Sequence, residues 1–116
     1  MNNRNTLKKN SDFRRLYAKG KSAVNPYMAV YCRRNRTGLN RLGYTVSVKL
    51  GGAVVRNRVR RRLREIYRLN EDRLAAGCDV VVVARVRAAS SDYHRLEKSF
   101  LRLAGKLDLL KKEGMK

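Results

Sequence analysis

Apolar residues recur at helical spacing in three parts of the chain. The clearest is 53–70, which lacks proline and glycine and is rich in arginine, a good helix former. At about 100° per residue, its apolar positions fall on one side of a helix and most of its arginines on the other. The apolar positions are Val55, Val59, Leu63 and Ile66. We therefore predict one helix that packs with one side and carries charge on the other.

Two further apolar stripes predict a helix near the start of the chain and another near its end. Phe13, Leu16 and Tyr17 share one face of the first helix. Ser11 is a possible N-cap of this helix and Gly20 a possible stop. The last helix follows the capping sequence 90–92, and its stripe continues for about five turns. Its members are Tyr93, Leu96, Phe100, Leu103, Leu107 and Leu110. Packing on a sheet is the expected role, with a coiled-coil dimer as the alternative.

Three segments have the patterns of strands. Residues 27–33 follow Pro26 and alternate, with Met28, Val30 and Cys32 on one face and Tyr27, Ala29, Tyr31 and Arg33 on the other. Residues 42–48 also alternate and offer hydroxyl groups, followed by Lys49, on one face. Residues 79–85 form a continuous β-branched run, typical of a strand covered on both faces. We expect 79–85 in the middle of the sheet, parallel to 42–48, with the helix 53–70 as a crossover that would ordinarily be right-handed.

The net charge of the chain indicates what kind of ligand it binds. The formal charge of +20 and the pI near 11.1 exceed what solubility requires and indicate a polyanionic ligand. Nucleic acid is favoured over an anionic membrane, because no apolar run approaches the roughly 18 residues of a spanning helix. At 116 residues the chain is expected to form one domain, 1–116, with 1–6 and 111–116 as flexible ends. Residues 1–10 lack the apolar stretch of a signal peptide, which predicts a cytoplasmic protein.

The helix 53–70 concentrates this charge. It has seven arginines and one acid, Glu65, a possible partner for Arg61 or Arg62. A solvated helix face usually mixes both signs, whereas like charges at this spacing repel each other unless a polyanion binds them. The planar arginine fork suits phosphate, so phosphate binding is favoured over a merely solvated face. Gly51 and Gly52 precede the helix, but without the Lys-Ser/Thr pattern of a nucleotide-binding loop they do not predict NTP binding.

No catalytic or metal-binding constellation is visible in the sequence. The nine acids are scattered, and His94 is the only histidine. Nuclease chemistry usually needs paired carboxylates for a metal ion, or a histidine and lysine for acid–base work. Cys32 and Cys78 lie in or beside apolar strands, lack a CxxC motif and are expected to be reduced core thiols. We therefore predict no catalytic residue and no metal ligand in the protein itself.

The order of these elements resembles the protein subunit of bacterial ribonuclease P. In LGYTVSVKLGGAVVRNRVRRRLREIYR, a strand and a Lys-x-Gly turn precede Ala-Val-x-Arg-Asn-Arg, which opens the basic helix. The upstream segment NTLKKNSDFRRLYAKGK is similar to the family's first helix with its paired aromatic residues. The resemblance extends over nearly the whole chain. Gly52 departs from it, since family members often have Asn there, but the turn is preserved.

This resemblance implies an α+β fold: a single-domain α-β-β-β-α-β-α sandwich. It implies a mixed four-stranded sheet and a left-handed crossover, against the usual rule. It also implies a third strand before the arginine helix, which the residue pattern does not locate. The implied function is to assist a catalytic RNA in endonucleolytic removal of the 5′ leader from precursor tRNA. The RNA subunit would hold the Mg²⁺ ions and cut the bond.

The same resemblance assigns two groups of binding residues. Those expected to bind the catalytic RNA are Arg56, Asn57, Arg58, Arg60, Arg61, Arg64 and Arg68. Those expected to line the cleft for the precursor leader are Phe13, Tyr17, Tyr31, Ser47 and Lys49. Locally, Tyr31 could equally stack on RNA or pack within the sheet. A ribosomal or other structural RNA-binding protein remains an alternative, while a DNA reader is not expected because only Asn57 offers a base-reading amide.

Overall fold

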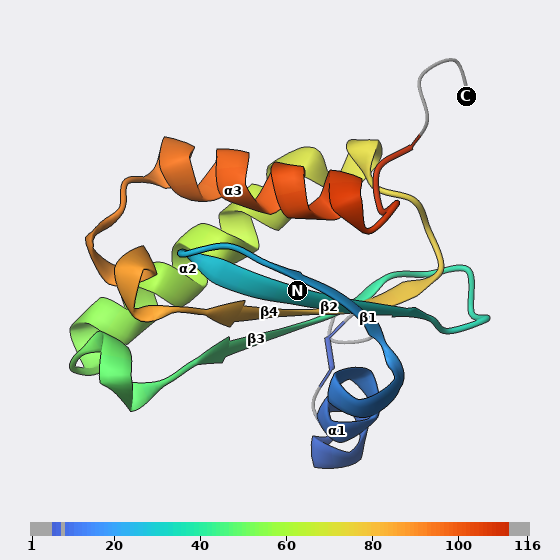
Figure 1. Cartoon of the computed structure of the whole chain (residues 1–116), viewed down its shortest axis with the longest axis horizontal. Helices are drawn as coiled ribbons and strands as arrows, with labels where there is room; N and C mark the ends of the chain where they lie inside the picture. The colour runs from blue at the N-terminus through green and yellow to red at the C-terminus, as the bar shows by residue number, and fades with distance from the viewer. Residues whose placement is uncertain (1–5, 8, 112–116) are drawn as a thin grey trace.

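The computed structural model of the protein describes residues 6, 7 and 9–111. Its helices are α1 (Asn10–Lys19), α2 (Ala53–Asn70) and α3 (Tyr93–Lys106), and its strands are β1 (Lys21–Val24), β2 (Met28–Arg34), β3 (Arg41–Val46) and β4 (Cys78–Ala84). Three short 3₁₀ turns join them: η2 (Val48–Leu50), η3 (Glu71–Arg73) and η4 (Val86–Ser90). Helix α1 lies on one face of the sheet, and α2 and α3 cover the other (Figure 1). The α-β-β-β-α-β-α order is confirmed.

The sheet has the strand order β1-β2-β4-β3. Strand β4 pairs antiparallel with β2 and parallel with β3, so the chain from β3 through α2 to β4 is a β-α-β crossover. Its hand agrees with the left-handed crossover that the resemblance implies (Figure 1). The predicted central position of the β-branched strand is confirmed, because Val80, Val81 and Val82 of β4 are almost fully buried.

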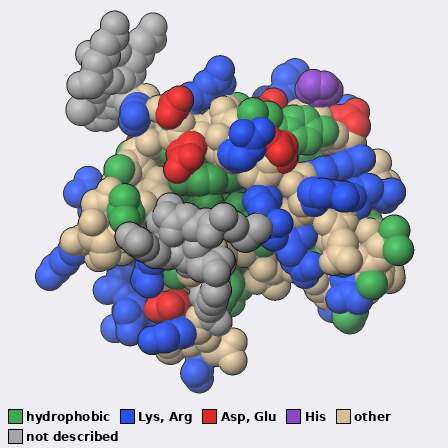
Figure 2. Space-filling model, turned by 180° about the vertical axis from the view of Figure 1, so that it is seen from behind, with side chains coloured by type: hydrophobic (Ala, Val, Ile, Leu, Met, Phe, Trp, Pro, Cys, Tyr) green, Lys and Arg blue, Asp and Glu red, His purple; other side chains and the backbone are tan. Residues whose placement is uncertain are grey.

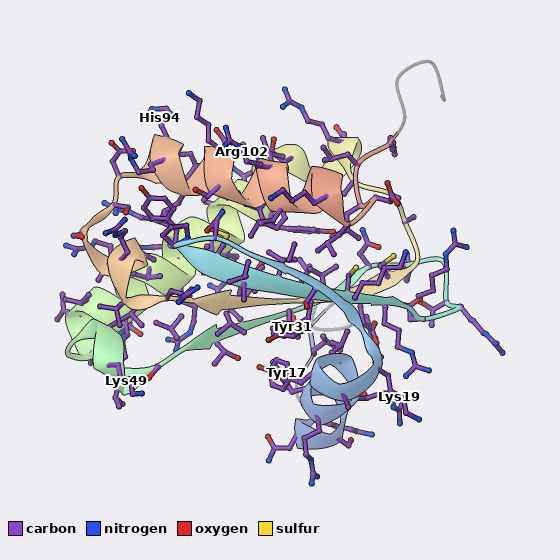
Figure 3. The ribbon with its side chains drawn as sticks, viewed as in Figure 1. Tyr17, Lys19, Tyr31, Lys49, His94 and Arg102 are labelled. Carbon is purple, nitrogen blue, oxygen red and sulfur yellow. The ribbon has the colours of Figure 1, made fainter. Side chains whose placement is uncertain are left out.

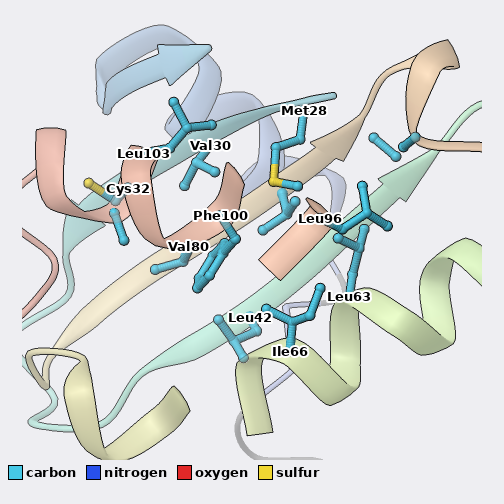
Figure 4. Packing of buried hydrophobic residues seen from close by; sticks show 14 of the residues in the cluster. Met28, Val30, Cys32, Leu42, Leu63, Ile66, Val80, Leu96, Phe100 and Leu103 are labelled. Atoms are coloured by element: carbon cyan, nitrogen blue, oxygen red, sulfur yellow. The ribbon is translucent and has the colours of Figure 1, made fainter. Parts of the chain in front are cut away.

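The main core fills the space between the sheet and helices α2 and α3. Apolar side chains from β2 and β4 meet those of both helices there, as the alternation and the helical stripes predicted (Figure 4). They include Met28, Val30, Leu63, Ile66, Leu96 and Leu103. A smaller cluster lies under α1, where Leu7 and Leu16 pack on Val81. The sheet is therefore covered fully on one face and only partly on the other.

Two features of the first strands differ from the sequence expectations. Strand β1 pairs antiparallel with β2, from Lys21 opposite Cys32 to Val24 opposite Ala29. It is short and largely exposed, so it has no apolar alternation that could reveal it. Tyr27 precedes β2 and packs against the core below α3. Contrary to the prediction, it therefore does not share a face with Tyr31. The turn at Asn25 rotates it, since the Asn25 carboxamide oxygen accepts hydrogen bonds from the backbone N–H groups of Tyr27 and Met28.

Two helix ends also differ. The N-cap position of α1 is Lys9, without a side-chain cap, and Ser11 lies inside the helix. Helix α3 begins at the predicted cap, where Asp92 accepts a hydrogen bond from the Arg95 N–H, but it ends at Lys106. Asp108 then adopts a positive φ of 58°, a common way to end a helix. Leu109 remains buried because the chain turns back and pairs with the segment after α2.

The residues next to the chain ends are held to the body. Thr6 forms a β-bridge with Leu42, and the Lys111 N–H donates to the Arg73 carbonyl. The remainder of the predicted flexible ends, 1–5 and 112–116, lies outside the described residues. None of the described helices combines the length and the apolar character needed to cross a membrane.

Both cysteines are free thiols at one end of the core. Cys32 is buried and Cys78 is half-buried. Burial, followed by the nearby Cys78, raises the pKa of Cys32 to about 11. Burial also raises the pKa of Cys78. The prediction that Cys32 and Cys78 are reduced core thiols is thus consistent with their place in the fold.

A charged network fastens β3 to β4 beneath α1. Arg41 donates two hydrogen bonds to the Asp79 carboxylate, from Nε at 2.8 Å and from Nη2 at 2.7 Å. The Asn35 amide donates a third at 2.9 Å. Partial burial works to raise the pKa of Asp79, but these hydrogen bonds and the Arg41 charge outweigh it and hold that pKa below its ordinary value.

We expect the Asp79 network to contribute stability that is lost in acid. A lowered folded-state pKa stabilises the fold above the unfolded pKa of about 3.9 and ceases to do so as the pH falls through the folded value. Asp79→Asn should lower the free energy of unfolding at pH 7 by about 1–3 kcal/mol. It should also flatten the loss of stability below about pH 4, measured by urea unfolding across pH. An unchanged acid profile, compared with the exposed Asp72→Asn control, would contradict this assignment.

Candidate nucleic-acid interface

Helix α2 presents an arginine surface on the side away from the sheet. Val59, Leu63 and Ile66 are buried beneath the helix, so the positions on its opposite side must face outward. Six residues form what we call the α2 surface: Arg56, Asn57, Arg60, Arg61, Arg64 and Arg68. Asn57, Arg61, Arg64 and Arg68 are exposed, and Arg56 and Arg60 are half-exposed. Six of the seven residues predicted to bind the catalytic RNA are thus brought together.

Few acids neutralise this surface. Glu65 pairs with Arg68, three residues later, and not with Arg61 or Arg62 as expected. The Asn57 carboxamide oxygen accepts a hydrogen bond from Arg60 at 3.1 Å, which orients that side chain without removing its charge. Among the described residues, the other salt bridges are those of Arg41 with Asp79 and Asp12. Seen from behind, Lys and Arg side chains cover much of the molecule and acids form isolated spots (Figure 2).

Arg58 lies apart from the other predicted residues of α2. Its Nη2 donates to the Ala89 carbonyl at 3.4 Å, and its Nε is buried without a hydrogen-bond partner. Arg62 is similar, since its Nη1 donates to the Ser91 carbonyl at 2.9 Å. Both side chains therefore hold α2 to the segment that leads into α3. The sequence does not separate them from the outward arginines, because their partners lie in a segment about 30 residues later in the chain.

The partly covered face of the sheet carries an aromatic cleft. Phe13 and Tyr17 project from α1, one helical turn apart, with ring centroids 6.5 Å from each other. Tyr31 of β2 meets Tyr17 edge-on, with a centroid distance of 4.9 Å. The Tyr17 hydroxyl lies 3.2 Å from the Thr45 hydroxyl of β3. Asn10, Phe13, Arg14, Tyr17 and Thr45 line an open hollow here. Three of the five predicted cleft residues are thus brought together, and Thr45 joins them.

The other two predicted cleft residues lie farther along the same face. Strand β3 ends at Val46, so Ser47 and Lys49 belong to the turn η2 and not to the strand. The Ser47 hydroxyl accepts a hydrogen bond from the Lys49 N–H at 3.1 Å, which caps that turn. Lys49 is exposed at one end of the sheet, whereas Tyr17 and Tyr31 lie near its middle (Figure 3). These two residues extend the face of the cleft and do not border its aromatic part.

Gly43 explains how the cleft reaches its shape. A Cβ atom at this position would lie 2.7 Å from Cζ of Phe13 and 3.3 Å from Cβ of Leu7. The Phe13 ring therefore lies directly against the bare backbone of β3. The sequence pattern gives no sign of this contact, since it depends on where α1 crosses the sheet.

Two surfaces of different chemistry therefore lie on one small basic body. One is a row of arginines on a helix, suited to closely spaced phosphates. The other is an open aromatic cleft, suited to stacking on unpaired bases. A basic α+β domain with these two surfaces has the properties of an RNA-binding protein.

Comparison with known proteins identifies the family. The chain belongs to the ribonuclease P protein family, whose family model, described as Ribonuclease P, matches residues 1–108. It is 44% identical over 107 residues to the ribonuclease P protein component of Natranaerobius thermophilus, covering 92% of this chain and 93% of that one. It is 45% identical over 103 residues to the component of Caldanaerobacter subterraneus subsp. tengcongensis, covering 89% of each.

Solved structures show the same relationship. The fold superposes on the ribonuclease P protein of Staphylococcus aureus with a TM-score of 0.85 and 33% identity, covering 92% of this chain and 98% of that one. For the Thermotoga maritima protein the TM-score is 0.77 with 33% identity, covering 84% of this chain and 92% of that one. Like its family, the chain is an RNA-binding accessory subunit of a ribonucleoprotein endoribonuclease of tRNA processing and works with ribonuclease P RNA. The alternative of a ribosomal protein is thereby excluded.

Proposed function

We propose that the two surfaces bind two different RNA segments at the same time. The observation that carries this proposal is their separation: α1 and the cleft lie on one face of the sheet, and α2 lies on the other (Figure 1). The α2 surface would bind the catalytic RNA, and the cleft would bind the 5′ leader of precursor tRNA. Because both contacts are made by one body with a shared sheet, the protein would hold substrate and catalyst in a fixed relation.

The cleft is suited to a leader because it is open and aromatic. Tyr17 is 43% exposed, and it forms an edge-on pair with Tyr31 that limits the motion of both rings. Stacking of a base on such a ring contributes about 1–3 kcal/mol with little sequence preference. This gives tighter binding of the precursor than of mature tRNA, which has no leader.

The metal ions of the reaction are assigned to the RNA. Within the described residues, no three His, Cys, Asp or Glu side chains lie close enough to hold a metal ion. The best-placed carboxylates have other partners: Asp79 binds Arg41, and Glu65 binds Arg68. The residues that we describe therefore do not fit a Mg²⁺ site, and we propose that the RNA subunit holds Mg²⁺. Since precursor tRNA is the proposed substrate, the protein would act in the cytoplasm.

Reconstitution provides the direct test. A 5′-extended precursor tRNA would be incubated at low Mg²⁺ with a bacterial ribonuclease P RNA, with and without this protein. Cleavage at the mature 5′ end is expected only when both are present. The protein neutralises phosphates that repel each other at low ionic strength, and this lowers the Mg²⁺ requirement. Tight RNA binding without any stimulation of cleavage would contradict the proposed role.

Gly43→Ala tests the cleft by changing the backbone position against which the Phe13 ring packs. The added methyl group must displace the Phe13 ring, which lies within 2.8 Å of it. We expect the affinity for precursor tRNA to fall several-fold, with a loss of about 1–3 kcal/mol in unfolding free energy. Affinity for the catalytic RNA should not change, because α2 lies on the other face. Filter binding of both RNAs measures this, with Gly52→Ala as a control at a position with open space for a Cβ.

A further inference from the structure

A second hollow lies on the opposite side of the sheet from the cleft. It opens between the turn before β2 and the outer face of α3, with a volume of about 530 Å³. Its basic side chains come from α3: His94, Arg95, Lys98 and Arg102. Figure 3 shows His94 and Arg102 on the side of the sheet away from Tyr17 and Tyr31. We call this region the α3 hollow.

The acids that line the α3 hollow have other partners. Asp92 caps α3 by accepting a hydrogen bond from the Arg95 N–H at 2.8 Å. Glu97 accepts a hydrogen bond at 2.9 Å from Asn70, a buried residue of α2. In the described part of the chain, neither Lys98 nor Arg102 takes part in a salt bridge. Two exposed cations therefore face the hollow without a neutralising partner, four residues apart on one helix, where like charges repel each other.

The turn before β2 holds the Arg95 side chain in place at the hollow. The Arg95 guanidinium donates to the Tyr27 hydroxyl at 3.1 Å and lies 5.9 Å from the centre of the Tyr27 ring. The turn itself is anchored to α3, since the Asn25 amide donates to the Ser99 carbonyl at 3.4 Å. Arg95 and the turn therefore form a hydrogen-bonded side of the hollow, next to the exposed Lys98 and Arg102.

The same turn connects the α3 hollow to the cleft. Val24 opposes Ala29 on the cleft face of the sheet and is 56% exposed. Arg85, which follows β4, reaches the turn from the cleft face, where its Nη1 lies 3.3 Å from the Asn25 carbonyl oxygen. Strand β1 is the edge of the sheet here and is largely exposed. Arg85 is therefore a basic side chain at the turn that separates the cleft face from Arg95, Lys98 and Arg102, beside the exposed β1 edge.

We propose that the upstream part of a long leader leaves the cleft over the edge of β1 and places its phosphates in the α3 hollow. The occupant is single-stranded RNA continuous with the segment in the cleft, because Lys98 and Arg102 have no acidic partner in the described chain and Arg85 lies at the turn between the two regions. Phosphate would contact Lys98 and Arg102, while Arg95 would form a fixed wall. This inference rests on the proposed function of the cleft and adds a second contact for the same substrate.

The test compares two precursor tRNAs, with leaders of about 5 and about 15 nucleotides, the shorter one sufficient for a single binding site. The double variant Lys98→Gln/Arg102→Gln is reconstituted with the catalytic RNA, and precursor affinity is measured across a salt series. For the long leader we expect a several-fold loss of affinity and a salt slope smaller by about 1.4, from two lost single-strand contacts. The short leader should bind as before. Arg73→Gln/Lys106→Gln, with the same loss of charge at exposed positions outside the hollow, should affect neither.

Two results would overturn the inference. Unchanged affinity for the long leader would show that the hollow does not bind RNA. Equal losses for both leaders would show that it binds another part of the complex. Tyr31→Ala, measured with the short leader, keeps the two proposals separate. If that variant loses affinity while the double variant does not, the cleft assignment stands and the α3 hollow assignment fails.

Discussion

Replacing Arg60, Arg61 and Arg64 together with glutamine is expected to weaken binding of the catalytic RNA by about a hundredfold at near-physiological salt. These side chains belong to the α2 surface, and no described acid pairs with them. Each lost phosphate contact should reduce the salt slope of binding by about 0.7–0.9, so the triple variant should lose about 2–3. The measurement is a dissociation constant at several salt concentrations.

The fold should survive this change, because the three side chains point away from the core. Removing like charges at helical spacing relieves repulsion, so thermal stability should be equal to or higher than that of the parent. Arg33→Gln/Arg34→Gln/Arg36→Gln is the matched control, with the same loss of charge at exposed positions on β2 and the following loop. If both triple variants lost the same affinity, net charge would account for binding and the α2 surface would have no special role.

Tyr31→Ala is expected to weaken binding of precursor tRNA by about tenfold to a hundredfold while leaving mature tRNA unaffected. The change removes one stacking surface and also frees Tyr17, whose ring Tyr31 contacts edge-on at a centroid distance of 4.9 Å. Binding of both tRNAs to the reconstituted enzyme measures the effect. Tyr31→Phe keeps the ring and should bind almost as well as the parent. Equal losses of affinity for precursor and mature tRNA would contradict the proposal that the leader binds in the cleft.

The sequence predicted best the elements that have strong internal patterns. The bounds of α2 agree at both ends, and the buried run of valines correctly marked the centre of the sheet. Strand β1 could not be found, since an exposed edge strand of four residues has no apolar alternation. The predicted stripe of α3 extends one turn too far, because the helix ends at Lys106, and Leu107 and Leu110 pack against the core from the chain that turns back after it.

In the candidate site too, some features could be predicted from the sequence and others depend on tertiary packing. Phe13 and Tyr17 could be paired from helical spacing alone, whereas their contacts with Tyr31, Thr45 and Gly43 depend on how α1 crosses the sheet. The arginines of α2 can be grouped from the sequence, but the inward position of Arg58 depends on its contact with Ala89 in η4, 31 residues later. Helical periodicity identifies the direction of a side chain relative to its own helix. It does not identify what another helix places there.

The two native thiols have a practical consequence. With its pKa raised to about 11, Cys32 is ionised in roughly one molecule in ten thousand at pH 7, compared with a few per cent for a free cysteine. Thiol reagents attack the thiolate, so both native cysteines should be labelled slowly. A cysteine introduced at an exposed position, such as Ser22 on the cleft side of β1 or His94 on α3, would react first. Photocrosslinkers attached there could trace an RNA strand along the protein without prior removal of Cys32 and Cys78.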